Sequence, residues 1–207
     1  MDQRLSLLLI LFSLFFLSWS TVESAFPRRP QLSQAYIEDA CSATRYPTVC
    51  VKYLSRYANT AMQGPEQLAH LALSESLYRA LCTKAYILKV AKELEASRDR
   101  GCQEVKDCLA QISDTVIQLG QSIRQLRCLG DEPIGDDFFW HISNVETWVS
   151  AALTDTSTCL DELPGQNIGK TKATIKGKVL NVAQATSNAL ALFHRYAAKY
   201  KVTTKKP

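Results

Sequence analysis

The sequence predicts an all-α protein, folded as an antiparallel up-down four-helix bundle preceded by a short, disulfide-clipped α-hairpin. Three long segments carry apolar residues at alternating steps of four and three, which is the spacing of one face of an α-helix. No segment alternates apolar and polar residues for long enough to form a sheet. The breaks between the helical segments are short, and short connections place consecutive helices antiparallel to one another.

The first 25 residues show the three regions of a secretory signal peptide, so we expect residues 1–25 to be removed. Arg4 lies near the start, an apolar run spans 5–17, and small residues follow. The run has 13 residues, fewer than the ~20 that a membrane-spanning helix needs. A cleaved signal peptide is therefore favoured over a membrane anchor, and the mature protein is expected to be soluble and secreted.

Residues 26–62 form the predicted N-terminal hairpin extension. The stretch YIEDACSATRYPTVCVKYLS contains Cys41 and Cys50, with Pro47 between them. Because a proline disfavours the helical conformation of the residue before it, Tyr46 is expected to lie in a turn between two short helices. A disulfide between the two cysteines fits this hairpin and would limit its fraying. The sequence is compatible with packing on its own bundle or on a second chain.

Residues 63–207 are expected to form the four-helix bundle. Its first helix, about 65–97, has a less regular apolar face: Leu73, Leu77, Leu81, Leu88, Ala91 and Leu94. The other three helices have regular faces of about seven turns each. These faces consist of Val105, Leu109, Ile112, Val116, Leu119, Ile123 and Leu126; of Phe138, Ile142, Val145, Val149, Ala152, Thr156, Cys159 and Leu163; and of Ile175, Val179, Val182, Thr186, Ala189, Phe193, Tyr196 and Tyr200. Turn-forming segments at 97–101, 129–137 and 163–172 separate the helices.

Seven cysteines in a secreted chain predict a disulfide framework with at least one thiol left over. If the second and third helices turn back near residue 132, Cys159 lies opposite both Cys102 and Cys108, within about one turn of each. Cys159 is therefore expected to link two helices. Helix geometry leaves either Cys102 or Cys108 as its partner.

The sequence contains no motif that indicates catalysis or metal binding. Cys159 has no neighbouring histidine to act as a base, and His70, His141 and His194 lack the spacing of metal ligands. Nucleophile-elbow, phosphate-loop and zinc-protease motifs are absent from the sequence. We therefore expect a protein that is not an enzyme and that has neither a metal nor a cofactor.

Charge is unevenly distributed along the sequence. No acidic residue follows Glu162, whereas nine basic residues do: Lys170, Lys172, Lys176, Lys178, Arg195, Lys199, Lys201, Lys205 and Lys206. A solvated helix face is the simplest interpretation, and attraction to an acidic polymer or protein is the alternative. Nucleic acid is an unsuitable partner because the chain is expected to be secreted and has no aromatic stacking platform. The sequence has no second long apolar run, so no contact with a membrane is expected.

Four segments occur in the order and spacing of a known family: IEDACSATRYPTVC, EVKDCLAQISDTVIQLG, TWVSAALTDTSTCLDEL and TSNALALFHRYA. Over nearly the whole mature chain, the sequence resembles the plant family of pectin methylesterase and invertase inhibitors. The resemblance implies a four-helix bundle with an N-terminal hairpin. It also implies two disulfides, Cys41–Cys50 and Cys108–Cys159.

Three cysteines have no place in the family pattern: Cys82, Cys102 and Cys128. We expect them to be buried structural thiols. Any of them that is exposed would be available for an intermolecular bridge.

The resemblance implies a secreted inhibitor of pectin methylesterase, located in the plant cell wall, or apoplast. It would form a non-covalent, one-to-one complex that blocks the cleft in which the pectin chain binds. In the esterase-inhibiting branch, the positions that face the enzyme correspond to Thr158 and Asp161. Independently, Thr154, Thr158 and Asp161 are spaced to lie on one helix face, away from the apolar face.

Two alternative functions remain open at the level of sequence. The other branch of the family inhibits acid invertase of the cell wall or vacuole and shares the fold and the cysteines, although TWVSAALTD favours the esterase branch. The basic segment 170–206 would also attract de-esterified pectin, a polyanion, through an interaction that salt weakens.

Overall fold

A computed structural model describes residues 33–60, 64–99, 101–130, 132–163 and 169–203. The expected signal peptide, residues 1–25, lies outside the described residues. Within these ranges every regular element is a helix, so the all-α prediction is confirmed. The elements are α2 (Gln34–Ser42), α3 (Pro47–Leu54), the 3₁₀ helix η1 (Ser55–Tyr57), α4 (Gly64–Ala96), α5 (Cys102–Cys128), α6 (Asp136–Glu162) and α7 (Lys170–Thr203).

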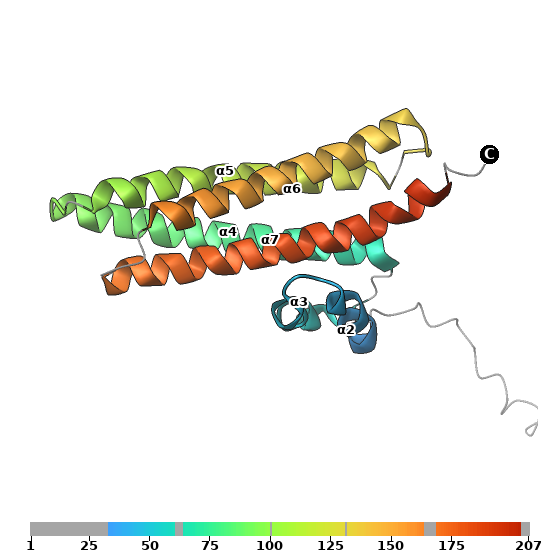
Figure 1. Cartoon of the computed structure of the whole chain (residues 1–207), viewed down its shortest axis with the longest axis horizontal. Helices are drawn as coiled ribbons and strands as arrows, with labels where there is room; N and C mark the ends of the chain where they lie inside the picture. Colours follow the sequence, from blue (N-terminus) through green and yellow to red (C-terminus); the bar gives the residue numbers. More distant parts are fainter. Residues whose placement is uncertain (1–32, 61–63, 100, 131, 164–168, 204–207) are drawn as a thin grey trace, which may run out of the picture. The chain divides into compact units, whose positions relative to one another are not determined.

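Helices α4 to α7 form a four-helix bundle (Figure 1). Consecutive helices run antiparallel, and α7 packs against both α6 and α4, so each helix has two neighbours in the bundle. This is the predicted up-down arrangement. Among the described residues, no helix combines the length and apolarity that crossing a membrane requires.

The apolar faces predicted for α6, α7 and α5 lie largely in the core. Every residue of the predicted α6 face is buried, and in α7 only Tyr200 is half-buried. In α5, Leu109 and Val116 are half-buried, while Cys108 and Thr115 occupy the central positions beside them. The helical period therefore placed these faces to within one residue.

The apolar face predicted for α4 is only partly correct, since Leu73 and Ala91 are buried and Leu77 and Leu94 are half-buried. Leu81 and Leu88 are 48% and 41% exposed. The buried side of α4 follows Leu73, Ser76, Ala80, Thr83, Ile87 and Val90, and three of these residues, Ser76, Ala80 and Thr83, are small. Small side chains at a helix contact reduce the interaxial distance. Ser76 is accommodated because its hydroxyl donates to the backbone oxygen of Ala72 at 2.9 Å.

The hairpin packs on its own bundle, against α4 and α7 (Figure 1). Pro47 begins α3, and Ser33 caps α2 by accepting a hydrogen bond from the backbone N–H of Tyr36 at 3.1 Å. In the turn between these helices, the backbone N–H of Tyr46 donates to Asn188 Oδ1 at 3.0 Å. Asn188 Nδ2 donates back to the Tyr46 carbonyl at 2.9 Å, so one amide side chain of α7 holds the turn.

Two further contacts join the hairpin to α7. Arg195 pairs with Asp39 of α2 at 2.9 Å, and the hydroxyl of Tyr53 in α3 donates to Asn181 Oδ1 at 3.4 Å. The boundary between hairpin extension and bundle, predicted after residue 62, falls within 61–63, outside the described residues, and stays a prediction.

A buried carboxylate lies where the hairpin meets α4. Glu75 is 2% exposed, and its carboxylate pairs with Arg79 at 2.7 Å and with Arg56 of η1 at 3.6 Å. The hydroxyl of Tyr57 donates to Glu75 Oε2 at 3.3 Å. The guanidinium of Arg79 also lies 3.3 Å from the ring centroid of Tyr53, a cation–π contact. Residues of η1, α3 and α4 thus meet around a single carboxylate.

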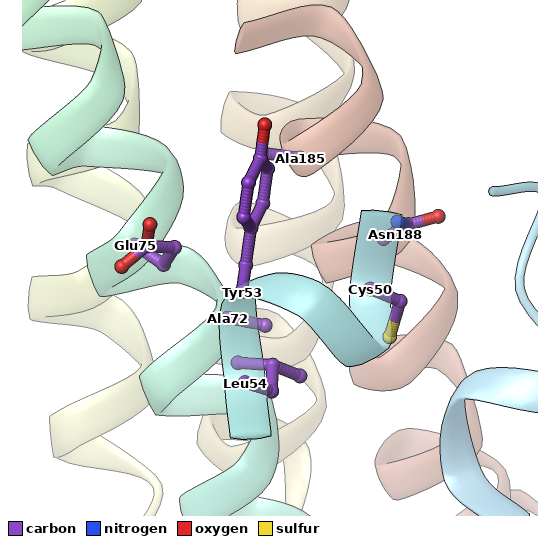
Figure 2. Close-up of a pocket in the computed structure, with 7 residues that line it drawn as sticks. All are labelled: Cys50, Tyr53, Leu54, Ala72, Glu75, Ala185 and Asn188. Carbon is purple, nitrogen blue, oxygen red and sulfur yellow. The ribbon is translucent and has the colours of Figure 1, made fainter. Parts of the chain in front are cut away.

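A small cavity of about 10 Å³ lies beside Glu75, between α3, α4 and α7 (Figure 2). Figure 2 shows Tyr53 of α3 between Glu75 of α4 and Asn188 of α7. This volume is close to the minimum of roughly 10–15 Å³ that one water molecule needs. The hairpin therefore fits closely on the bundle, and we regard the cavity as part of its packing rather than a ligand site.

Candidate interaction surface

The outward side of α6 carries the three predicted partner-binding residues. Thr154 and Asp161 are exposed, and Thr158 is partly exposed. They follow one another at steps of four and three residues, so they lie on one side of the helix. The hairpin packs elsewhere, on α4 and α7. This side of α6 is therefore accessible to a partner.

The hydroxyl groups on this side are oriented by the helix backbone. Thr158 Oγ1 donates to the Thr154 carbonyl at 3.0 Å, and Thr154 Oγ1 donates to the Ser150 carbonyl at 3.2 Å. Each bond uses the hydroxyl proton and leaves oxygen lone pairs that can accept a hydrogen bond. Together with the carboxylate of Asp161, these threonines present acceptor atoms at fixed positions.

A disulfide lies next to these residues, on the inner side of α6. Cys159 is bonded to Cys108, with Cα atoms 4.4 Å apart and both residues fully buried. The bond joins α5 to α6 immediately beside Thr158 and restrains the end of α6. The other disulfide, Cys41–Cys50, closes the hairpin with a Cα–Cα distance of 5.6 Å.

The remaining cysteines Cys82, Cys102 and Cys128 are free thiols. Cys102, which helix geometry had left as a possible partner of Cys159, lies with its Sγ 3.7 Å from the backbone oxygen of Ala91. Cys82 and Cys128 are exposed, so the expectation of burial is wrong for both. Cys82 lies nine residues after the buried Leu73, which places it on the opposite, outward side of α4.

Acidic side chains of α5 and α6 lie near one another, next to the predicted residues. Burial raises the pKa of Asp155; a hydrogen bond with Gln118 opposes the shift, and the nearby carboxylate of Asp114 adds to it. Burial also raises the pKa of Glu162, with a further contribution from Asp107. No basic side chain contributes to either shift, and Asp155 was not among the residues predicted from the sequence.

One simple sequence signal indicates this group of acidic residues. Helix α6 has six acidic residues and no lysine or arginine; the acids are Asp136, Asp137, Glu146, Asp155, Asp161 and Glu162. The neighbouring α7 has basic residues and no acidic one. The α6 side of the bundle therefore attracts positively charged groups of a partner.

Replacing Asp155 by asparagine is expected to stabilise the protein at neutral pH and to weaken the pH dependence of its stability. A raised carboxyl pKa means that the folded protein binds a proton more readily than the unfolded chain. The free energy of unfolding then rises as the pH falls from neutral toward the ordinary carboxyl range near pH ~4. Urea unfolding at neutral and mildly acidic pH measures this slope. Asp161→Asn, at an exposed position, is the control, and an unchanged slope in Asp155→Asn would contradict the assignment.

The histidines have structural surroundings rather than those of metal ligands. His141 Nδ1 lies 2.6 Å from Gln125 Oε1, His70 contacts a side chain of α5, and His194 Nε2 lies 3.5 Å from Glu146 Oε1. In the described part of the chain, no group of three or more His, Cys, Asp or Glu residues could hold a metal ion.

A rigid helical bundle with an accessible polar helix face is the architecture of a protein-binding module. The chain belongs to the plant invertase/pectin methylesterase inhibitor family, whose model matches residues 35–192. It is 42% identical to pectinesterase inhibitor 9 of Arabidopsis thaliana over 197 residues, covering 94% of this chain and 95% of that protein. Pectinesterase inhibitor 11 of the same plant is 38% identical over 193 residues, covering 90% and 95% of the two chains.

Solved structures agree with this assignment at the level of the fold. The crystal structure of a pectin methylesterase inhibitor from Arabidopsis thaliana matches with a TM-score of 0.54 at 18% identity, covering 77% of this chain and 95% of that one. A mutant form of an Arabidopsis inhibitor matches with a TM-score of 0.59 at 18% identity, covering 74% and 92%. The resemblance found in the sequence is thus confirmed. The expectation that the chain is not an enzyme is also confirmed, because the family consists of inhibitors.

Proposed function

We propose that this protein is an inhibitor of pectin methylesterase. The observation that carries the proposal is the similarity, at 38% and 42% identity and over nearly the full length, to Arabidopsis proteins named pectinesterase inhibitors. The esterase is accordingly the proposed partner, bound one-to-one.

Inhibition is steric in this proposal. The protein binds the esterase without a covalent bond and blocks the cleft in which the pectin chain lies. The polar side of α6 supports this mechanism because its acceptor groups are held in place by the backbone and by a neighbouring disulfide. A surface that is ordered before binding loses little conformational entropy in the complex.

Thr154, Thr158 and Asp161 are the proposed contact residues. Asp161 pairs with a basic group of the enzyme, and the threonine oxygens accept hydrogen bonds from it. The lack of lysine and arginine in α6 supports this assignment, because no cation on the same helix would repel a basic partner.

The proposed location is the cell wall, outside the cell. Residues 1–25 have the pattern of a secretory signal peptide, and two disulfides are typical of a protein that folds in an oxidising compartment. Pectin methylesterase acts on a wall polymer, so inhibitor and enzyme would meet there.

A paired inhibition assay tests the function. The oxidised protein is titrated against a plant pectin methylesterase and a plant acid invertase in the same mildly acidic buffer. We expect loss of esterase activity alone. Loss of invertase activity alone would transfer the function to the other branch named in the family description. If neither enzyme is inhibited, the proposed function is wrong for both targets.

The double substitution Thr158→Ala/Asp161→Ala is expected to weaken esterase inhibition by about 10- to 100-fold, equivalent to about 1.4–2.8 kcal/mol. It removes a proposed charge pair and an acceptor without altering the core, so the helical circular dichroism spectrum should be unchanged. Thr171→Ala/Thr174→Ala, at two exposed positions of α7, is the matched control. Full inhibition by the α6 variant would exclude these residues from the interface.

Weak contact with pectin through α7 is a secondary proposal. Its positive charge supports the contact, but three of its basic side chains are already engaged: Lys172 with Glu104, Lys178 with the ring of Tyr86, and Arg195 with Asp39. Such binding is therefore expected to be weak and to disappear in salt, whereas a packed enzyme interface is less salt-sensitive. Retention of the protein on immobilised de-esterified pectin, at low and high salt, measures it.

A further inference from the structure

Two large apolar side chains of α6 are exposed, Trp140 and Trp148. Trp140 is the more exposed of the two, and it lies far from the predicted contact residues. Trp140 is 59% exposed. It precedes Thr158 by eighteen residues, which at 3.6 residues per turn is five full turns. The two side chains therefore project in the same direction, about 27 Å apart along the helix at 1.5 Å per residue.

The side chains between these two positions project little from the helix. Most side chains on this side are short, namely Ser143, Thr147, Ser150, Thr154 and Ser157, and all five are exposed. Thr147 Oγ1 donates to the Ser143 carbonyl at 2.8 Å, so its hydroxyl follows the helix like those of Thr154 and Thr158. Trp148, the other tryptophan of α6, is 36% exposed, but it is rotated by about 80° from Trp140 and so lies at the side of this strip. A partner lying along this side meets a flat polar strip with one aromatic projection at its end.

The indole of Trp140 is held in place although it is exposed. Its ring contacts the ring of His141 edge-on, with centroids 5.0 Å apart. His141 is in turn fixed by its 2.6 Å hydrogen bond to Gln125 of α5. An ordered, exposed tryptophan loses little entropy when a partner covers it, and tryptophan is among the residues most enriched at interface hot spots.

The size of the surface favours including Trp140 in it. A helix is about 10 Å wide, so Thr154 to Asp161 offers on the order of 100 Å² and Trp140 to Asp161 about 300 Å². A stable complex buries about 800 Å² on each partner. The three predicted residues supply a small fraction of that area, and extension to Trp140 roughly triples it.

Charge at the two ends of the strip is of the same sign. Asp136 and Asp137 precede Trp140 in the first turn of α6, and Asp161 and Glu162 lie in its last turn. A single partner surface can therefore pair with the acidic residues at both ends of the strip if it carries basic groups at both ends. It must also contain an apolar recess for the indole.

We infer that Trp140 is a second anchor of the esterase-binding surface, inserted into an apolar recess of the enzyme about 27 Å from the group that binds Thr158 and Asp161. The inference rests on the proposed function. It extends the contact from the last two turns of α6 by about four further turns toward the N-terminus of the helix. The partner it specifies is an esterase with a basic rim and an apolar pocket at one end of the contacted surface.

Trp140→Ala tests the inference, with Tyr78→Ala as the matched control. Tyr78 is an aromatic residue with a similar exposure of 57%, but it lies on α4. We expect Trp140→Ala to raise the inhibition constant at least about 30-fold, the size of a hot-spot loss. Trp140→Phe should retain part of the affinity, and Tyr78→Ala should inhibit like the unmodified protein. Thermal unfolding of each variant verifies that the fold is intact.

The outcomes separate the inference from the proposed function. If the unmodified protein inhibits the esterase and Trp140→Ala inhibits it equally well, the second anchor is wrong and the inhibitor function stands. If Tyr78→Ala loses as much affinity as Trp140→Ala, the effect is not specific to α6 and the anchor is likewise wrong. If the unmodified protein does not inhibit, both fail.

Discussion

Replacing Glu75 by alanine is expected to lower the free energy of unfolding by about 3 kcal/mol, at the low end of the 3–5 kcal/mol lost when a buried ion pair is broken. The carboxylate is nearly fully buried and faces Arg79, Arg56 and the hydroxyl of Tyr57. Without it, two cations are left close together with no counter-charge. Both arginines retain some contact with solvent, which limits the loss.

Urea unfolding measures this loss, and hydrogen exchange locates it. Because Arg56 and Tyr57 belong to the hairpin side of the contact, exchange should accelerate first in α2 and α3 and later in the bundle. Glu95→Ala is the matched control, because it breaks a 2.7 Å ion pair between Glu95 and Lys106 in which the side chain of Glu95 is 63% exposed. Exposed pairs contribute little to stability, so this control should unfold like the unmodified protein. Equal effects of the two substitutions would show that burial of Glu75 is unimportant.

Sequence periodicity predicted the bundle well because the buried residues of α6 follow the helical period and all but Thr156 are apolar. In α4 the same reasoning placed Leu73 and Ala91 correctly and Leu81 and Leu88 wrongly. The series Leu73, Leu77, Leu81 and the series Leu73, Ser76, Ala80 both follow the helical period. Hydrophobicity favours the first, whereas the structure buries the second. Close packing against two neighbouring helices and the hairpin decides between the two series. The sequence of α4 alone does not specify which of its sides these neighbours cover.

The candidate surface was predictable for the same reason that α6 was. Once the buried side of that helix is known, the positions of Thr154, Thr158 and Asp161 follow from the helical period. The surroundings of Glu75 could not be predicted this way, because they depend on how the hairpin docks. One contact that holds the hairpin on the bundle, between Tyr46 and Asn188, joins residues 142 positions apart. No local pattern specifies such a pair.

Removing the disulfide between α5 and α6, by Cys108→Ala/Cys159→Ala, is expected to lower the free energy of unfolding by about 4 kcal/mol. The bond closes a loop with a sequence separation of 51, against 9 for Cys41–Cys50. A longer loop gives the unfolded chain more conformational freedom when the bond is absent. By the same chain-entropy relation, Cys41→Ala/Cys50→Ala should cost about 2.6 kcal/mol.

The two variants should also differ in inhibition, and this difference is the more informative measurement. Cys159 adjoins Thr158, so loss of its bond frees the end of α6 that carries the proposed contacts, and esterase inhibition should weaken beyond what the unfolded fraction explains. The hairpin disulfide lies against α4 and α7, so its removal should leave the inhibition constant of the folded protein nearly unchanged. Assays at a temperature at which both variants are folded make the comparison direct. A greater loss of inhibition in the hairpin variant would place the binding surface near the hairpin instead of on α6.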